Sequence, residues 1–211
     1  MNIPAKLTLC LAAALSMIGS AFGASRTAPN VIVILADDLG YADAGFQGGK
    51  DIPTPHLDRL AAGGTVFSNA YVTFATCAPS RAGFITGRYP QRFGFERNLA
   101  WQPANPSAGL DLRETMLPAA LRPAGYKSAL IGKWHLGSHD DFHPLNRGFD
   151  EFYGHLGGGK RYFPEDLTII NTLDCENEPD SYRSLITRGR EPVRTEDYLT
   201  REFTREALDF V

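Results

Sequence analysis

The segment that decides the fold runs from Thr76 to Gly87 and reads Thr-Cys-Ala-Pro-Ser-Arg-Ala-Gly-Phe-Ile-Thr-Gly. A proline near its start and a glycine at its end are the order expected for a short helix that begins beside Cys77. Such a helix would present its positive end to the cysteine sulfur, and Arg81 would follow one turn later. The segment therefore predicts a cysteine placed at a helix N-terminus.

The residues alone leave different interpretations of Cys77 open. An isolated cysteine is most often a small buried apolar side chain. Cys77 could instead be a thiolate nucleophile that the helix end and Arg81 activate. Against that interpretation, the chain between Cys77 and Arg81 is too short for the anion-binding loop of cysteine phosphatases. A further interpretation comes from a family resemblance.

The run from Cys77 to Arg81, followed by Thr86 and Gly87, resembles the signature of the sulfatase family of formylglycine-dependent, arylsulfatase-like enzymes. In that family the cysteine is oxidised to formylglycine, an aldehyde that serves as the nucleophile. The resemblance implies that Cys77 is the precursor of the nucleophile and that Arg81 steadies the hydrated aldehyde. It also implies a formylglycine-generating enzyme as a partner.

Two adjacent acids, Asp37 and Asp38, follow an apolar run at residues 30–36 that predicts a strand buried on both faces of a parallel sheet. Such a pair is usually a solvated strand end, and its carboxylates would converge only where the strand breaks, as Gly40 suggests. Residues 36–43 resemble the metal segment of sulfatases. The resemblance implies that both acids and the modified Cys77 bind Ca²⁺, with Mg²⁺ as the alternative, and that Asp43 is structural.

A lysine and a histidine follow the strand predicted over residues 126–131, in the hexapeptide Gly-Lys-Trp-His-Leu-Gly at 132–137. Residues two apart can point to one side of an extended segment, but a loop lysine and histidine are more often surface residues. The hexapeptide resembles the second sulfatase signature. The resemblance implies that Lys133 binds sulfate oxygens and that His135 is the base for sulfate release. No role is expected for His139, His143 or His155.

Strand and helix signals alternate along the chain, which predicts an α/β fold with a largely parallel sheet and helices on both faces. The resemblance implies the alkaline-phosphatase-like version of that sheet. The expected elements are helices over 54–64 and 115–121 and from Thr195 onward, strands over 65–72 and 126–131, and an irregular aromatic loop over 88–108.

Residues 1–23 combine one charge, an apolar run and a small-residue exit, which predicts a signal peptide cleaved after Gly23. The chain is therefore expected to be exported, periplasmic or secreted, with no stable membrane anchor. Residues 24–211 are expected to be the N-terminal part of a sulfatase domain, because the family's later ligands have no counterpart here. A disulfide between Cys77 and Cys175 would be the default in an exported protein, and formylglycine at Cys77 would exclude it.

The composition bounds the class of function. The chain has 211 residues, 43% of them hydrophobic, and a formal net charge of −3, which suits one globular core. The basic residues do not form a run, so the composition does not point to a nucleic-acid partner. The resemblance implies a hydrolase that cleaves sulfate esters of a small molecule or glycan. The isolated fragment is expected to be inactive. The alternatives are a phosphate or phosphonate ester hydrolase on the same scaffold and a non-catalytic glycan-binding remnant.

Overall fold

The computed structural model describes residues 28–163 and 184–211 and divides the chain into two units, residues 1–37 and 38–211. In the first unit, the described residues 28–37 form neither a helix nor a strand, and Val31–Leu35 are exposed. The predicted strand over 30–36 is therefore wrong. Its β-branched residues supply propensity, but a strand also needs a hydrogen-bonded neighbour. The predicted signal peptide lies outside the described residues.

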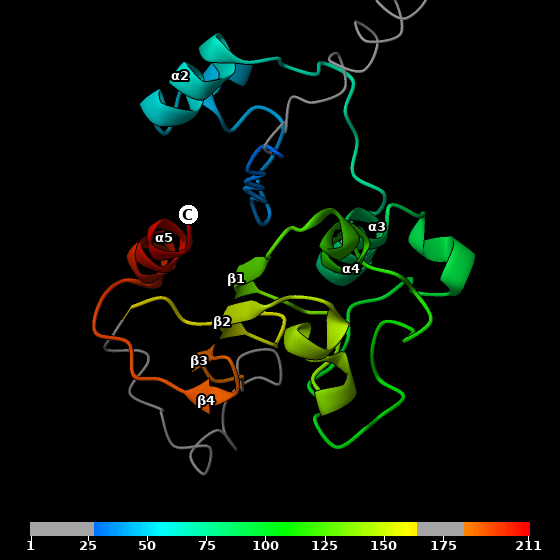
Figure 1. The fold of residues 1–211 in the computed structure, drawn as a ribbon. Coiled ribbons are helices and arrows are strands. Elements are labelled where there is room, and N and C mark those ends of the chain that lie inside the picture. The colour runs from blue at the N-terminus through cyan, green and yellow to red at the C-terminus, as the bar shows by residue number, and fades with distance from the viewer. Residues whose placement is uncertain (1–27, 164–183) are drawn as a thin grey trace, which may run out of the picture. The chain divides into compact units, whose positions relative to one another are not determined.

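The second unit contains a mixed sheet in the order β1 (Ala129–Lys133), β2 (Glu151–His155), β3 (Thr187–Arg188) and β4 (Glu191–Pro192) (Figure 1). β1 and β2 run parallel, whereas β2–β3 and β3–β4 are antiparallel pairs. The sheet is mixed rather than largely parallel because β3 and β4 form a tight hairpin. Gly189 adopts the left-handed φ of 58° that this hairpin requires.

Helices cover both faces of this sheet, and the alternation of side chains along β1 explains why. Leu130 packs into a core with residues of α3 (Cys77–Thr86), whereas Ile131 packs into a second core with Leu199 of α5 (Leu199–Phe210). Figure 1 shows α5 on one side of β1 and β2, and α3 and α4 (Leu117–Leu121) on the other. The predicted α/β class with helices on both faces is confirmed.

Helix α3 begins at Cys77, as predicted. Thr76 is extended at the N-cap but makes no side-chain cap, and Gly87 ends the helix with a left-handed φ of 65°. The capping interaction comes instead from the loop that follows the helix. There the side-chain oxygen of Asn98 accepts a hydrogen bond of 2.9 Å from the Ala78 amide. The first turn beside Cys77 is thus fixed by a distant residue.

The remaining predicted elements agree in part with the structure. α2 spans Pro55–Gly63, as expected, but none of its residues is buried. The predicted strand over 65–72 is wrong, since these residues form no strand and Phe67 and Tyr71 are exposed. α5 begins at Leu199, four positions after the expected start at Thr195. The 3-10 helices of the described ranges are η2 (Gly45–Gln47), η3 (Pro90–Phe93), η4 (Arg122–Ala124), η5 (Asp140–Phe142) and η6 (Pro144–Arg147).

None of the helices in residues 28–163 and 184–211 is both long enough and apolar enough to cross a membrane.

A glycine in β2 permits the parallel pairing with β1. Gly154 pairs with Gly132, and a Cβ on Gly154 would overlap the Gly132 carbonyl oxygen. We expect Gly154→Ala to lower the free energy of unfolding by roughly 3 kcal/mol, because backbone on both strands would have to shift. Gly63→Ala is the matched control, because a Cβ there meets nothing within 4 Å. Equal melting temperatures of the two variants in thermal denaturation would contradict this expectation.

Candidate active site

Cys77 is the first residue of α3, and its sulfur lies at the positive end of that helix. Among the described residues it carries a free thiol, and it is half-buried, so it is not a fully buried core residue. Cys175, the alternative disulfide partner, lies outside the described residues. The position of Cys77 combines access with an electropositive helix end, as a reactive or modified cysteine requires.

Asp38 lies close to Cys77 in the second unit. A carboxylate oxygen of Asp38 and the Cys77 sulfur are within 4.8 Å of each other. Residues 37 and 38 form a bend, and Asp38 has a left-handed φ of 57°. The extended course of the backbone therefore ends at Asp38. Both acids are exposed, and their hard oxygens suit Ca²⁺ or Mg²⁺.

A hydrogen bond joins the helix of Cys77 to the strand of Lys133. Arg81 Nη1 donates to the Lys133 carbonyl oxygen at 2.8 Å. This bond directs the half-buried guanidinium across from α3 to the carboxyl end of β1. Arg81 therefore connects two segments that are separated by more than 50 positions in the sequence.

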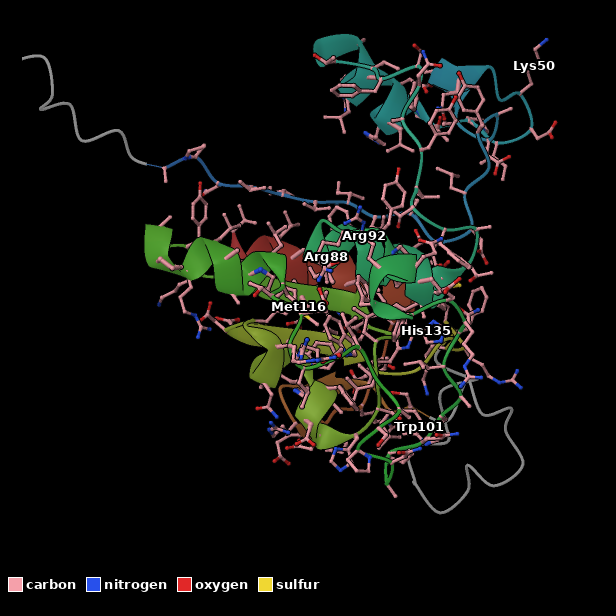
Figure 2. The ribbon with its side chains drawn as sticks, turned by 90° about the vertical axis from the view of Figure 1, so that its right-hand side faces the viewer. Lys50, Arg88, Arg92, Trp101, Met116 and His135 are labelled. Atoms are coloured by element: carbon pink, nitrogen blue, oxygen red, sulfur yellow. The ribbon has the colours of Figure 1, made fainter. Side chains whose placement is uncertain are left out.

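His135 lies just beyond the end of β1 and is labelled in Figure 2. Its side chain is buried, and its Nε2 lies 3.3 Å from the Leu99 carbonyl oxygen. If Nε2 donates this hydrogen bond, the neutral ring carries its lone pair on Nδ1. Its backbone amide donates to the Leu156 carbonyl, which extends the β1–β2 pairing past the strand ends. Both the ring and the backbone of His135 are therefore held in place.

Backbone conformation singles out the same candidates. Within residues 28–163 and 184–211, the non-glycine residues with positive φ are Asp38 at 57° and His135 at 62°. A left-handed conformation is unfavourable for a residue with a Cβ and persists where surrounding structure imposes it. Such residues concentrate at functional sites. This observation is independent of the sequence motifs and points to two of the residues that the motifs selected.

The elements that carry the candidate residues differ from the expected ones. Convergence was expected from three strand ends, but only Lys133 and His135 lie at a strand end. Residues 30–36 and 65–72, which precede the acids and Cys77, form no strands. In the second unit, core packing and the hydrogen bond from Arg81 connect α3, which carries Cys77, to the end of β1.

Sequence reasoning missed some residues around this site. Asn98 caps α3, Gly158 contacts the ring of His135, and His155 lies beside Lys133 across the β1–β2 pair. The pairing of Lys133 with His155 had no sequence signal, because no strand was predicted over residues 151–155 and no role was expected for His155. The contact of Gly158 had no signal beyond the glycine run at 157–159.

Comparison with known proteins decides the family. The sulfatase family model matches residues 29–211. The chain belongs to the sulfatase family. Among curated sulfatases, N-acetylgalactosamine-6-sulfatase of Mus musculus is 36% identical over 207 residues, which are 93% of this chain and 39% of the relative. Human steryl-sulfatase is 44% identical over 157 residues, which are 70% of this chain and 25% of the relative.

Solved structures support the alkaline-phosphatase-like fold class. The crystal structure of Ps i-CgsB in complex with k-i-k-neocarrahexaose has 40% sequence identity and a TM-score of 0.79. The match covers 87% of this chain and 41% of that chain. PsFucS1 sulfatase from Pseudoalteromonas sp. has 28% identity and a TM-score of 0.68. The chain thus spans less than half the length of both solved chains.

Proposed function

We propose that the protein carrying this chain hydrolyses sulfate esters with a formylglycine nucleophile made from Cys77. The observation that carries the proposal is the position of Cys77 at the start of α3, within 4.8 Å of an Asp38 oxygen. Arg81, one turn along the same helix, bonds to the backbone of Lys133. Membership of the sulfatase family gives these contacts a chemical interpretation.

In the proposed reaction, the aldehyde at position 77 is hydrated and carries two hydroxyl groups on one carbon. One hydroxyl oxygen attacks the sulfur of the ester, loses its proton, and the S–O bond to the alcohol breaks. The alcohol leaves after taking up a proton. A serine could perform this step, but its sulfate ester would have no internal route of release.

The second hydroxyl provides that route. We assign His135 as the base that removes its proton, whereupon the C=O bond forms again and the C–O bond to sulfate breaks. Lys133 would bind the sulfate oxygens, and Arg81 would steady the hydrated aldehyde. Each such contact is expected to stabilise the transition state by about 3 kcal/mol.

Asp37 and Asp38 would hold a divalent cation together with the aldehyde hydrate at position 77. We infer Ca²⁺, with Mg²⁺ as the alternative, because carboxylate oxygens are the donors that these cations prefer. When bound, the cation supplies positive charge that polarises the nucleophile and a sulfate oxygen. Since Ca²⁺ takes about six to eight oxygen ligands, these residues alone are expected to bind it weakly. We therefore expect residues 24–211 alone not to turn over an aryl sulfate.

The substrate is proposed to be a sulfated small molecule or glycan. The named relatives include an N-acetylgalactosamine-6-sulfatase, and a solved neighbour carries a neocarrahexaose. We also propose export to the periplasm or the exterior and a formylglycine-generating enzyme as a partner. That enzyme would catalyse the two-electron oxidation of the Cys77 Cβ by an external oxidant such as dioxygen, with the sulfur leaving as sulfide and the Cβ becoming the aldehyde carbon.

Mass spectrometry of the peptide containing Cys77 tests the nucleophile. We expect the aldehyde in protein from the native host, because family membership and the position of Cys77 favour modification. An intact thiol there would contradict the proposal and would favour the glycan-binding remnant. Rates on matched aryl sulfate and aryl phosphate esters test the reaction. A faster rate on the phosphate would favour the alternative hydrolase.

A further inference from the structure

A buried histidine beside the candidate active site lacks partners for its polar atoms. His155 ends β2 and has 1% of its surface exposed. Neither of its ring nitrogens has a hydrogen-bond partner among the residues that the structure describes. Buried polar side chains are normally hydrogen-bonded, and leaving one unpaired is unfavourable. An unpaired imidazole at this place therefore suggests a contact made in another state of the site.

The surroundings of His155 determine which contact that is. His155 is the register partner of Lys133 in the parallel β1–β2 pair, so the two side chains leave the same face of the sheet. Burial, and after it the charges of Lys160, Lys133 and Arg81, lower the pKa of His155 to about 3. At neutral pH the ring is uncharged and offers one nitrogen lone pair. Among cationic neighbours, that lone pair suits an ammonium donor.

The turn after β2 contacts the other candidate residue. A Cβ placed on Gly158 would lie 2.6 Å from His135 Nε2 and 2.7 Å from its Cε1. The same Nε2 faces the Leu99 carbonyl oxygen. The ring of His135 is therefore confined between the Gly158 backbone and the Leu99 carbonyl. Only a glycine leaves room for the ring in this position.

We propose that His155 and Gly158 are positioning residues for the Lys133–His135 pair. In this proposal the neutral ring of His155 accepts a hydrogen bond from the Lys133 ammonium and orients it toward the sulfate group. The Gly158 backbone sets the position of the His135 ring. The inference rests on the proposed function, because Lys133 and His135 take their roles from it. It adds two residues, both contributed by β2 and the turn that follows.

Two substitutions of His155 in the intact protein test the first half of the proposal, which is that His155 positions Lys133. His155→Leu removes both polar atoms, and His155→Gln keeps an acceptor. We expect His155→Leu to raise the KM for an aryl sulfate and the inhibition constant of inorganic sulfate about 10-fold, the size of one charge-assisted hydrogen bond. His155→Gln should stay within about 3-fold of the unaltered protein. Equal inhibition constants for both variants, or no sulfate binding by the unaltered protein, would overturn this half.

Gly158→Ala tests the second half of the proposal, which is that Gly158 positions the His135 ring. Gly63→Ala serves as the control, because a Cβ at Gly63 would meet nothing within 4 Å. We expect Gly158→Ala to move the ring resonances of His135 in a proton–nitrogen correlation spectrum and to lower kcat about 100-fold. Gly63→Ala should change neither. Unmoved His135 resonances in Gly158→Ala would overturn this half, whatever the effect on stability.

These readouts separate the inference from the proposed function. Sulfate binding and the His135 resonances need no turnover, so they test the positioning residues even if the protein proves not to be a sulfatase. Conversely, His155→Leu and Gly158→Ala could turn over an aryl sulfate at the rate of the unaltered protein. That result would support the proposed function and contradict the inference.

Discussion

Replacement of Cys77 by alanine is expected to reduce aryl sulfate hydrolysis to the uncatalysed background, a loss of at least about 10⁴-fold. The proposed nucleophile is made from this residue, and the chemistry offers no second hydroxyl in its place. The half-buried position at the first turn of α3 tolerates a smaller side chain, so the fold should persist. The initial rate of alcohol release, together with the melting temperature, checks both expectations.

Cys77→Ser separates the two stages of the reaction. A serine has one hydroxyl, so it could accept the sulfate but could not expel it by forming an aldehyde. We expect alcohol release to stop after at most one equivalent per protein molecule. Multiple turnovers by Cys77→Ser would show that release does not need the second hydroxyl, and the formylglycine mechanism would then be wrong. Unreduced turnover by Cys77→Ala would remove the nucleophile assignment altogether.

Replacement of Asp38 by asparagine is expected to lower kcat/KM by about 10²- to 10³-fold and to weaken Ca²⁺ binding. The substitution removes the negative charge but keeps the shape of the side chain. Asparagine also tolerates the left-handed φ of 57° at this position, so backbone strain is not the cause of the loss. Kinetics with added Ca²⁺ and calorimetric titration of the metal-depleted protein provide the measurements.

Asp43→Asn is the matched control for Asp38→Asn. Asp43 belongs to the same acidic segment, but its Oδ2 accepts a 2.6 Å hydrogen bond from the Gly40 amide, which is a structural role. We expect its kcat/KM to stay within about 3-fold of the unaltered protein. If both variants lose Ca²⁺ binding equally, the effect belongs to the overall charge of the segment and not to a ligand at position 38.

The helix-end signals predicted their element more accurately than strand propensity predicted the strands. The proline and glycine signals placed α3 correctly, because they act within a few residues of the helix ends. The strands predicted over 30–36 and 65–72 were wrong, because strand formation depends on a neighbour that local sequence does not specify. The prediction of an α/β class was nevertheless correct, because β1, β2 and the helices that flank them define that class.

The interactions that hold the candidate site could not be predicted, for a related reason. The cap of α3 by Asn98 and the confinement of His135 by Gly158 join residues that are 20 or more positions apart. Neither contact leaves a periodic pattern. The buried and unpaired state of His155 likewise depends on the packing around β2, which appears only in three dimensions.

The hydrogen bond from Arg81 to the Lys133 carbonyl has a consequence for engineering. It joins one regular element to another through main-chain and side-chain atoms and uses no residue of the aromatic loop at 88–108. Exchange of the exposed loop residues, while keeping Asn98 and the core-packed Phe93, Phe95 and Leu99, should therefore leave the spacing between the start of α3 and the end of β1 unaltered.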